Sequence, residues 1–225
     1  MNTPSLQTEQ VRSYIDALFE TNAVKIAKDP DALFVTRNGG ESWIYVDHGD
    51  LIADKKGNQA FINALREIVE PQFSQDKTVL LNVLSKASAQ TTGAIAYACG
   101  YSQIPFQSEE VKDLERGTLR MFRLPNMDKV THLVIIDDVL TTGQTIVETM
   151  DILKKHSSLD ITKLSIHAVV GLARKPKQST QNLQKVHITP HWLTSLTAII
   201  HATWPSLTEK QKVGLKQEYP EVDFQ

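Results

Sequence analysis

The sequence predicts an α/β protein in which helices flank one parallel sheet and a small hood precedes it. Apolar runs typical of buried strands alternate with helical patterns along the chain, and this alternation produces a parallel sheet with right-handed crossovers. The most apolar run, 133–136, leads directly into two adjacent carboxylates, Asp137 and Asp138. Open α/β sheets place their ligands at this end of a strand.

The composition is that of an ordinary globular protein. We interpret the 225 residues as one domain over 1–225 rather than two. A net charge of −2 does not favour a nucleic-acid partner. No apolar run approaches the ~20 residues that a membrane span needs, and residues 1–10 lack the apolar core of a signal peptide. We therefore expect a cytoplasmic protein without a membrane partner.

The hood is predicted at about 11–50, together with C-terminal elements. Apolar residues recur at helical spacing near the start of the chain: Val11, Tyr14, Ile15, Leu18 and Phe19. Two short strands, 32–36 and 43–46, then flank a glycine-bearing turn at 37–41.

The elements of the sheet follow in order. Strands are predicted at 78–83, 104–106, 133–136, 164–170 and 185–188. Helical patterns cover about 58–70, 89–98, 144–156 and 189–196. The polar segments 107–117 and 172–184 read as loops, and we expect the charged tail, 207–225, to be partly flexible.

The segment after the two acids is rich in hydrogen-bond donors. It reads Val139, Leu140, Thr141, Thr142, Gly143, Gln144 and Thr145, and an amphipathic helix begins at about Gln144. Amides at a helix N-terminus, with the positive end of the helix dipole, bind phosphate dianions. The alternative is a buried strand that ends before a capping threonine. It explains neither the two adjacent carboxylates nor the excess of donors, so we favour a ribose 5′-phosphate site.

Residues 135–145 resemble the phosphoribosyl pyrophosphate motif of type I phosphoribosyltransferases. The resemblance implies that Asp137 and Asp138 bind the ribose hydroxyls and that residues 139–145 hold the 5′-phosphate. It also implies Mg²⁺ as cofactor. The metal would be carried by the substrate with no direct protein ligand, and the two acids would reach it only through water.

The rest of the chain is most similar to orotate phosphoribosyltransferases. Residues 34–47 resemble the hood that covers the base, with Arg37 near the pyrophosphate and Tyr45 against orotate. Arg174 lies where that family binds the orotate carboxylate, by bidentate pairing. The resemblance implies synthesis of orotidine monophosphate, a step of pyrimidine biosynthesis, by a homodimer. A solvated turn for Arg37, a surface cluster for Arg174 and a core position for Tyr45 remain alternatives.

Two segments depart from the family. Residues 82–88 contain no glycine, although Lys86 takes the place of a family lysine; glycine there would let the backbone approach a diphosphate. The loop at 107–117 is net acidic, and Arg116 is one of its two cations. An acidic loop would oppose departure of pyrophosphate. Two other functions therefore stay open: a catalytically impaired sensor of phosphoribosyl pyrophosphate or a nucleotide, and transfer to another base.

Overall fold

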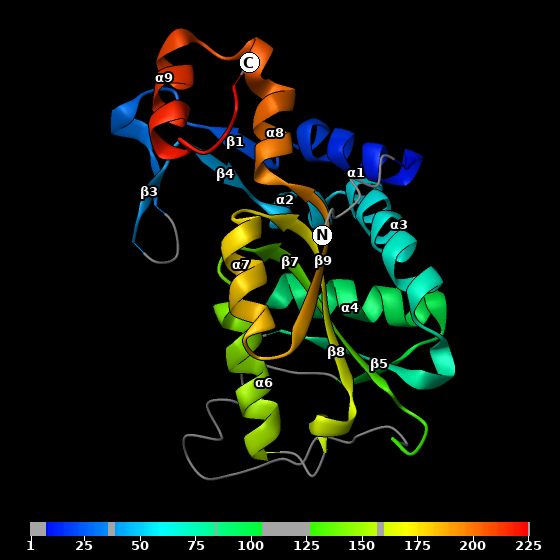
Figure 1. The fold of residues 1–225 in the computed structure, drawn as a ribbon. Helices are drawn as coiled ribbons and strands as arrows, with labels where there is room; N and C mark the ends of the chain where they lie inside the picture. Colours follow the sequence, from blue (N-terminus) through cyan, green and yellow to red (C-terminus); the bar gives the residue numbers. More distant parts are fainter. Residues whose placement is uncertain (1–7, 36–38, 84, 105–126, 157–159, 225) are drawn as a thin grey trace.

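The centre of the molecule is a five-stranded parallel sheet of order β6-β5-β7-β8-β9 (Figure 1). The computed structural model describes residues 8–35, 39–83, 85–104, 127–156 and 160–224. The strands are β5 (Thr78–Asn82), β6 (Ser102–Ile104), β7 (His132–Leu140), β8 (Ser165–Ala173) and β9 (Ile188–Ser195). The prediction of a parallel sheet flanked by helices is confirmed.

Helices cover both faces of this sheet. The helices α1 (Glu9–Glu20), α3 (Lys55–Gln72) and α4 (Lys86–Cys99) lie on one face, and α6 (Gln144–His156) and α7 (Pro176–Gln184) on the other. Because side chains alternate along a strand, Val134 and Ile136 pack into the first core, while Leu133 and Ile135 pack into the second. Burial on both sides explains the uninterrupted apolar run of β7.

The hood contains two small antiparallel pairs. β1 (Val24–Ile26) pairs with β4 (Ile44–Val46), and β2 (Phe34–Val35) pairs with β3 (Glu41–Ser42). The helix α2 (His48–Ala53) follows. The two predicted strands appear as β2 and β4, but they do not pair with each other. β2 pairs with β3, which lies at the end of the predicted turn, and β4 pairs with β1, a strand that was not predicted.

The charged tail that was expected to be partly flexible, 207–225, forms a helix and packs on the core over the residues that the structure describes. The chain continues through α8 (Leu196–Thr203), a 3₁₀ turn (Trp204–Ser206) and α9 (Glu209–Glu218), which lies against the hood (Figure 1). Thr208 and Gln211 form a capping box at the start of α9. The side chains of Leu207, Leu215, Tyr219 and Val222 are buried in the same core as α1 and α3. A few apolar positions thus decide the fold of a segment whose composition is mostly charged.

Two other predictions near the C-terminus are wrong. The polar segment predicted as a loop contains α7, which begins with Pro176 at its first turn and buries Ser179 and Leu183. The segment 189–196, which was predicted as a helix, is mostly strand, since β9 runs through Pro190 to Ser195 and shares only Ile188 with the strand predicted at 185–188. Proline lacks an amide donor and is tolerated in a strand at the edge of a sheet, which is where β9 lies.

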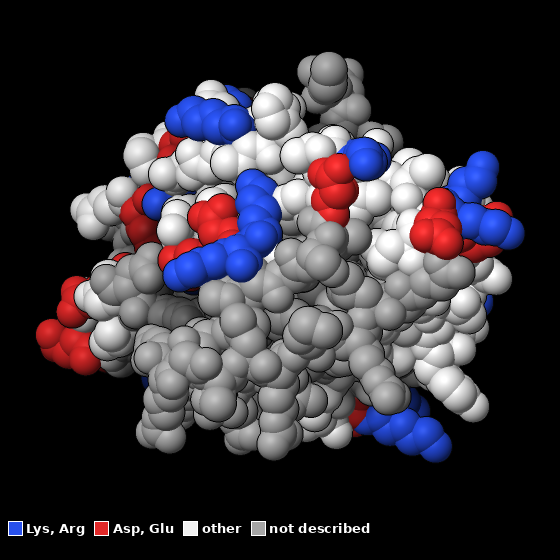
Figure 2. Space-filling view, turned by 90° about the horizontal axis from the view of Figure 1, so that it is seen from below, with Lys and Arg blue, Asp and Glu red and all other residues white. Residues whose placement is uncertain are grey.

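The described surface carries interspersed charges. Figure 2 shows Lys and Arg side chains next to Asp and Glu side chains on the face seen from below. The ion pairs Lys154–Asp151 and Lys163–Asp160 have the same character. Within the described ranges, no helix combines the length and the apolar character that crossing a membrane requires.

Candidate functional site

Asp137 and Asp138 are the sixth and seventh of the nine residues of β7, where this strand still pairs with β8. They leave the strand on opposite faces, which reduces the repulsion between the two carboxylates. Each is oriented by the next backbone amide: Asp138 N donates to Asp137 Oδ1 at 2.9 Å, and Val139 N donates to Asp138 Oδ1 at 3.0 Å. Asp137 is buried and Asp138 is half-buried. Both acids are therefore held by the backbone before any ligand arrives.

The loop after β7 leads directly into α6. Gly143 has a φ of +84°, in the left-handed region that favours glycine. A Cβ at this position would lie 2.9 Å from Leu183 of α7, and Asn182 of the same helix donates from Nδ2 to the Thr142 carbonyl at 3.0 Å. The helix α7 thus braces the loop after β7. The role of Asn182 in supporting the candidate site was missed, because its own segment, 172–184, was predicted to have no helix.

The first turn of α6 follows this loop and offers its backbone amides. Gln144 N lies 3.4 Å from Thr142 Oγ1, and Val147 N donates to the Gly143 carbonyl at 3.1 Å. The amides of Thr145 and Ile146 lie between these two in the first turn of α6, where amides lack intrahelical partners, so these two are the ones available to an anion. The structure brings the acids, the threonine-rich loop and the helix N-terminus together along one short stretch of chain.

A buried polar pair lies behind Asp138. The hydroxyl of Tyr14 and Nε2 of His48 are 2.7 Å apart, and both residues are buried. Tyr14 fits there because Gly171 has no side chain: a Cβ on Gly171 would lie 2.9 Å from the hydroxyl. Burial, and then the charge of Asp138, raise the pKa of Tyr14, while burial lowers the pKa of His48. Both groups therefore stay neutral near the acid.

Residues 82–85 connect β5 to α4 beside these acids. Asn82 pairs with Ile136 in the sheet. Val83 N donates to Ser88 Oγ at 2.9 Å, and the Ser88 hydroxyl donates to the Ile136 carbonyl. Val83 is fully buried. Its amide is therefore already used inside the protein, in a segment where glycine would leave the backbone open to a ligand.

Arg174 follows the last residue of β8 and points to the hood. Its Nη2 donates to Ser42 Oγ at 3.1 Å, to the Tyr219 hydroxyl at 3.3 Å and to the Ile44 carbonyl at 3.4 Å. Tyr45 lies on the adjacent strand, half-buried, with its ring 5.8 Å from that of Phe34. The two residues predicted to hold a base thus both lie at the hood. Tyr45 is part of it, and Arg174 reaches it from the end of β8.

Three predicted cations are not placed at the site. Arg37 and Arg116 lie outside the described residues, as does the whole loop at 107–117. Lys86 is the first residue of α4, after the capping residue Ser85; only its backbone is described. Their roles stay predictions.

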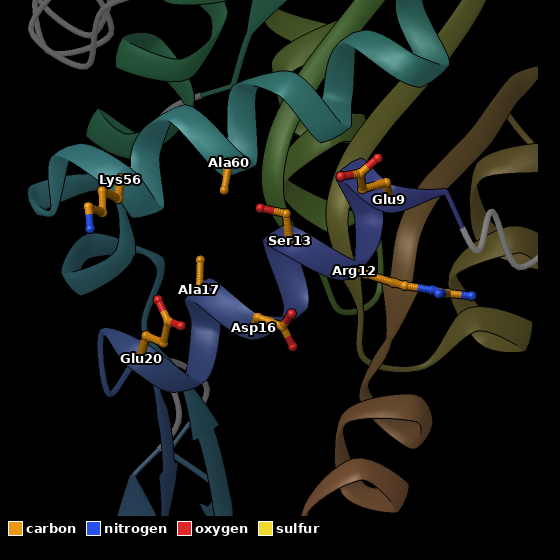
Figure 3. Close-up of a pocket in the computed structure, with 8 residues that line it drawn as sticks. All are labelled: Glu9, Arg12, Ser13, Asp16, Ala17, Glu20, Lys56 and Ala60. Carbon is orange, nitrogen blue, oxygen red and sulfur yellow. The ribbon is translucent and has the colours of Figure 1, made fainter.

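A separate groove of about 390 Å³ runs between α1 and α3 (Figure 3). Glu9, Asp16 and Glu20 line it together with Arg12 and Lys56, and Ala17 and Ala60 lie between the two helices. The groove contains none of the predicted site residues. Its mixed charges are typical of a solvated helix surface, so the strand end and α6 form the better candidate.

A known protein family matches the central part of the chain. A family model described as "Phosphoribosyl transferase domain" matches residues 61–195, more than half of the chain. This range includes the acids, the loop and Arg174. A search of curated protein sequences found no match.

Several solved structures share the fold at low identity. Orotate phosphoribosyltransferase from Aeropyrum pernix has a TM-score of 0.62 at 18% identity, covering 85% of this chain and 99% of its own. UMP synthase from Leishmania donovani has a TM-score of 0.70 at 18% identity, covering 95% of this chain and 43% of its own. Orotate phosphoribosyltransferase from Mycobacterium tuberculosis, in complex with 5-phospho-α-D-ribosyl 1-diphosphate, has a TM-score of 0.57 at 11% identity. The match covers 84% of this chain and 98% of the chain in that structure.

Proposed function

The chain belongs to the phosphoribosyl transferase domain family, and from this premise we propose that it transfers the phosphoribosyl group of phosphoribosyl pyrophosphate to orotate. The products are orotidine monophosphate and pyrophosphate. The observation that carries the proposal is the continuous arrangement of Asp137, Asp138, the 141–143 loop and the start of α6.

In this proposal the acids orient the sugar. Asp137 and Asp138 accept hydrogen bonds from the ribose 2′ and 3′ hydroxyls, since their carboxylates are already aimed by backbone amides. The loop hydroxyls and the first amides of α6 hold the 5′-phosphate. Binding both ends of the ribose phosphate fixes the reacting carbon, and positioning of this kind lowers the barrier of a transfer reaction.

The base would lie between the hood and the end of β8. Tyr45 offers a ring beside the hood strand, and Arg174 offers the positive charge that suits the carboxylate of orotate. The fold neighbours that carry the name orotate phosphoribosyltransferase support this choice of base. Arg37, Lys86 and Arg116 complete the proposal as cations that face the pyrophosphate.

The donor set suits Mg²⁺ carried by the substrate. Mg²⁺ prefers oxygen ligands and keeps several waters, with phosphates and one or two carboxylates completing its shell. Asp137 and Asp138 would meet such a hydrated ion through water, and the ion would neutralise charge on the diphosphate. A homodimer in the cytoplasm is part of the same proposal, supported by the sequence resemblance.

The test is ³¹P NMR of the protein with Mg²⁺, phosphoribosyl pyrophosphate and orotate. We expect an orotate-dependent pyrophosphate signal, and we expect the double variant D137N/D138N to lose it while its circular dichroism spectrum stays unchanged. Full turnover by the folded double variant would refute the role of the acids.

A specific observation favours a second candidate, a sensor that binds phosphoribosyl pyrophosphate or a nucleotide without reaction. The amide of Val83 is bonded to Ser88 in the segment where the family approaches the diphosphate. Broadened substrate lines without pyrophosphate release, for orotate and for a panel of purine and pyrimidine bases, would select this candidate. Release with another base alone would select a transferase of different specificity.

A further inference from the structure

One carboxylate from the C-terminal helix holds the hood strand. Ser42 Oγ donates to Glu218 Oε1 at 2.7 Å, and Trp43 N donates to Glu218 Oε2 at 2.7 Å. Hydrogen bonds to an ionised acceptor are about twice as strong as neutral ones. Both oxygens of Glu218 are therefore used on two successive residues at the junction of β3 and β4.

The same serine connects this carboxylate to Arg174. Ser42 Oγ accepts from Arg174 Nη2 and lies within 2.8 Å of the Ile44 carbonyl. Tyr219, the residue after Glu218, accepts from the same Nη2. Among the described residues, every hydrogen bond of the Arg174 side chain comes from this one nitrogen, while its backbone amide donates to the Leu140 carbonyl. The C-terminal helix, the hood and the end of β8 thus meet at a single guanidinium whose Nε and Nη1 groups face no described partner.

The helix that supplies Glu218 is rigidly packed. The ring of Trp43 lies so close to Gly214 that a Cβ there would be 2.0 Å from it. Leu215 is fully buried, and Gln211 Nε2 donates to the Ala27 carbonyl at 3.0 Å. The position of Glu218 is therefore set by the core, and Glu218 transmits that position to the hood.

We propose that Glu218 is a positioning residue for the base site, an inference that rests on the proposed function. It fixes the hood strand at a set distance from the end of β8 and, through Ser42 and Tyr219, anchors Arg174 by Nη2 alone. The remaining guanidinium groups then face the base in one orientation. Glu218 touches no substrate and leaves the ribose phosphate site, which β7 and α6 build, unaffected.

The variant Glu218→Ala tests this assignment. Losing two hydrogen bonds to a charged group should raise the KM for orotate by about 10- to 100-fold. The Kd for phosphoribosyl pyrophosphate, measured by calorimetry, should stay within about twofold of the wild-type value, because the ribose phosphate site of β7 and α6 is intact. Glu218→Gln keeps one acceptor oxygen and should give a smaller increase. A KM for orotate that is unchanged in Glu218→Ala would overturn the proposal.

Two control variants on α9 separate positioning from general loosening. Glu209→Gln alters an exposed carboxylate that bonds only to Lys212 among the described residues, and it should match the wild type. Leu215→Ala destabilises the same helix through the core; if it raised the KM as much as Glu218→Ala at equal loss of stability, the proposal would fail.

The role of Glu218 can still be tested if the wild type does not turn over orotate. That result would refute the proposed function, and hydrogen exchange would then decide whether Glu218 holds the hood. Glu218→Ala should speed exchange of the amides at 41–46 at least tenfold, with Glu209→Gln unchanged. Equal exchange in Glu218→Ala and wild type would sink the inference independently of any substrate.

Discussion

At the residue scale, Gly143 is the position in the candidate site that depends most on lacking a side chain. Its φ of +84° places it in the left-handed region, and Leu183 fills the space where a Cβ would project. The residue therefore combines two constraints, one from its own backbone and one from α7.

Gly143→Ala should destabilise the protein and weaken phosphate binding. The left-handed backbone alone should cost about 1–2 kcal/mol, and the contact with Leu183 adds to it. Denaturant unfolding and calorimetry with phosphoribosyl pyrophosphate measure the two effects. Gly39→Ala is the matched control, because Gly39 has a φ of +77° and no atom of a described residue lies within 4 Å of its Cβ position. Equal losses for both variants would contradict a role for Leu183.

At the element scale, three histidines form a row across β7, β8 and β9. The ring centroids of His132 and His167 are 5.7 Å apart, those of His167 and His191 are 5.5 Å apart, and Phe73 packs on the edge of the row. His167 Nδ1 and His191 Nε2 lie 3.3 Å apart. Burial, and then the neighbouring His191 and His132, lower the pKa of His167 to about 4. Burial also lowers the pKa of His191.

These lowered pKa values predict loss of stability in mild acid. In the unfolded chain, His167 takes up a proton near the ordinary histidine pKa of about 6.5, whereas in the folded protein it is not protonated until about pH 4. The stabilising contribution is therefore complete above about pH 6.5 and declines as the pH falls toward 4. His167→Gln should flatten the decline of the free energy of unfolding between pH 7 and 4. His201→Gln, at an exposed position on α8, should leave it unchanged, and an equally steep decline in His167→Gln would refute the prediction.

The contact between α9 and the hood gives a second prediction at this scale. Gly214→Ala would place a methyl group inside the ring of Trp43, so the helix must shift. We expect a loss of about 1–3 kcal/mol, the usual range for overpacking, measured by urea unfolding. Val213→Ala is the control on the same helix, because Val213 is 53% exposed. Unchanged stability in Gly214→Ala would mean that α9 does not pack on the hood.

At the scale of the whole molecule, ligand binding and folding are linked. A ligand at 100 times its Kd adds about 2.7 kcal/mol to stability, which for a chain of this size raises Tm by roughly 5–11 °C. Phosphoribosyl pyrophosphate with Mg²⁺ should produce such a shift in the wild type whether or not the protein turns over orotate. The D137N/D138N variant serves as the control and should show little or none. No shift in the wild type at millimolar ligand would contradict both the transferase and the sensor.

The sequence by itself determined the local features of this protein. The apolar run before Asp137, the donors that follow it and the periodicity of the flanking helices depend on neighbours in the chain. These features predicted the parallel sheet, which is confirmed. They also placed the candidate site on a short continuous segment, because β7, its loop and the start of α6 follow one another.

The tertiary structure alone decided how distant residues meet. Glu218 contacts Ser42 across 176 positions, and Arg174 reaches the same serine across 132. Asn182 braces the loop after β7 from a helix whose polar sequence was predicted to be a loop. The tail forms a packed helix because Leu215 and Tyr219 are buried in the core that α1, α3 and the hood share. Burial of a few apolar side chains against a distant surface outweighs local composition, and no pattern within one segment contains that information.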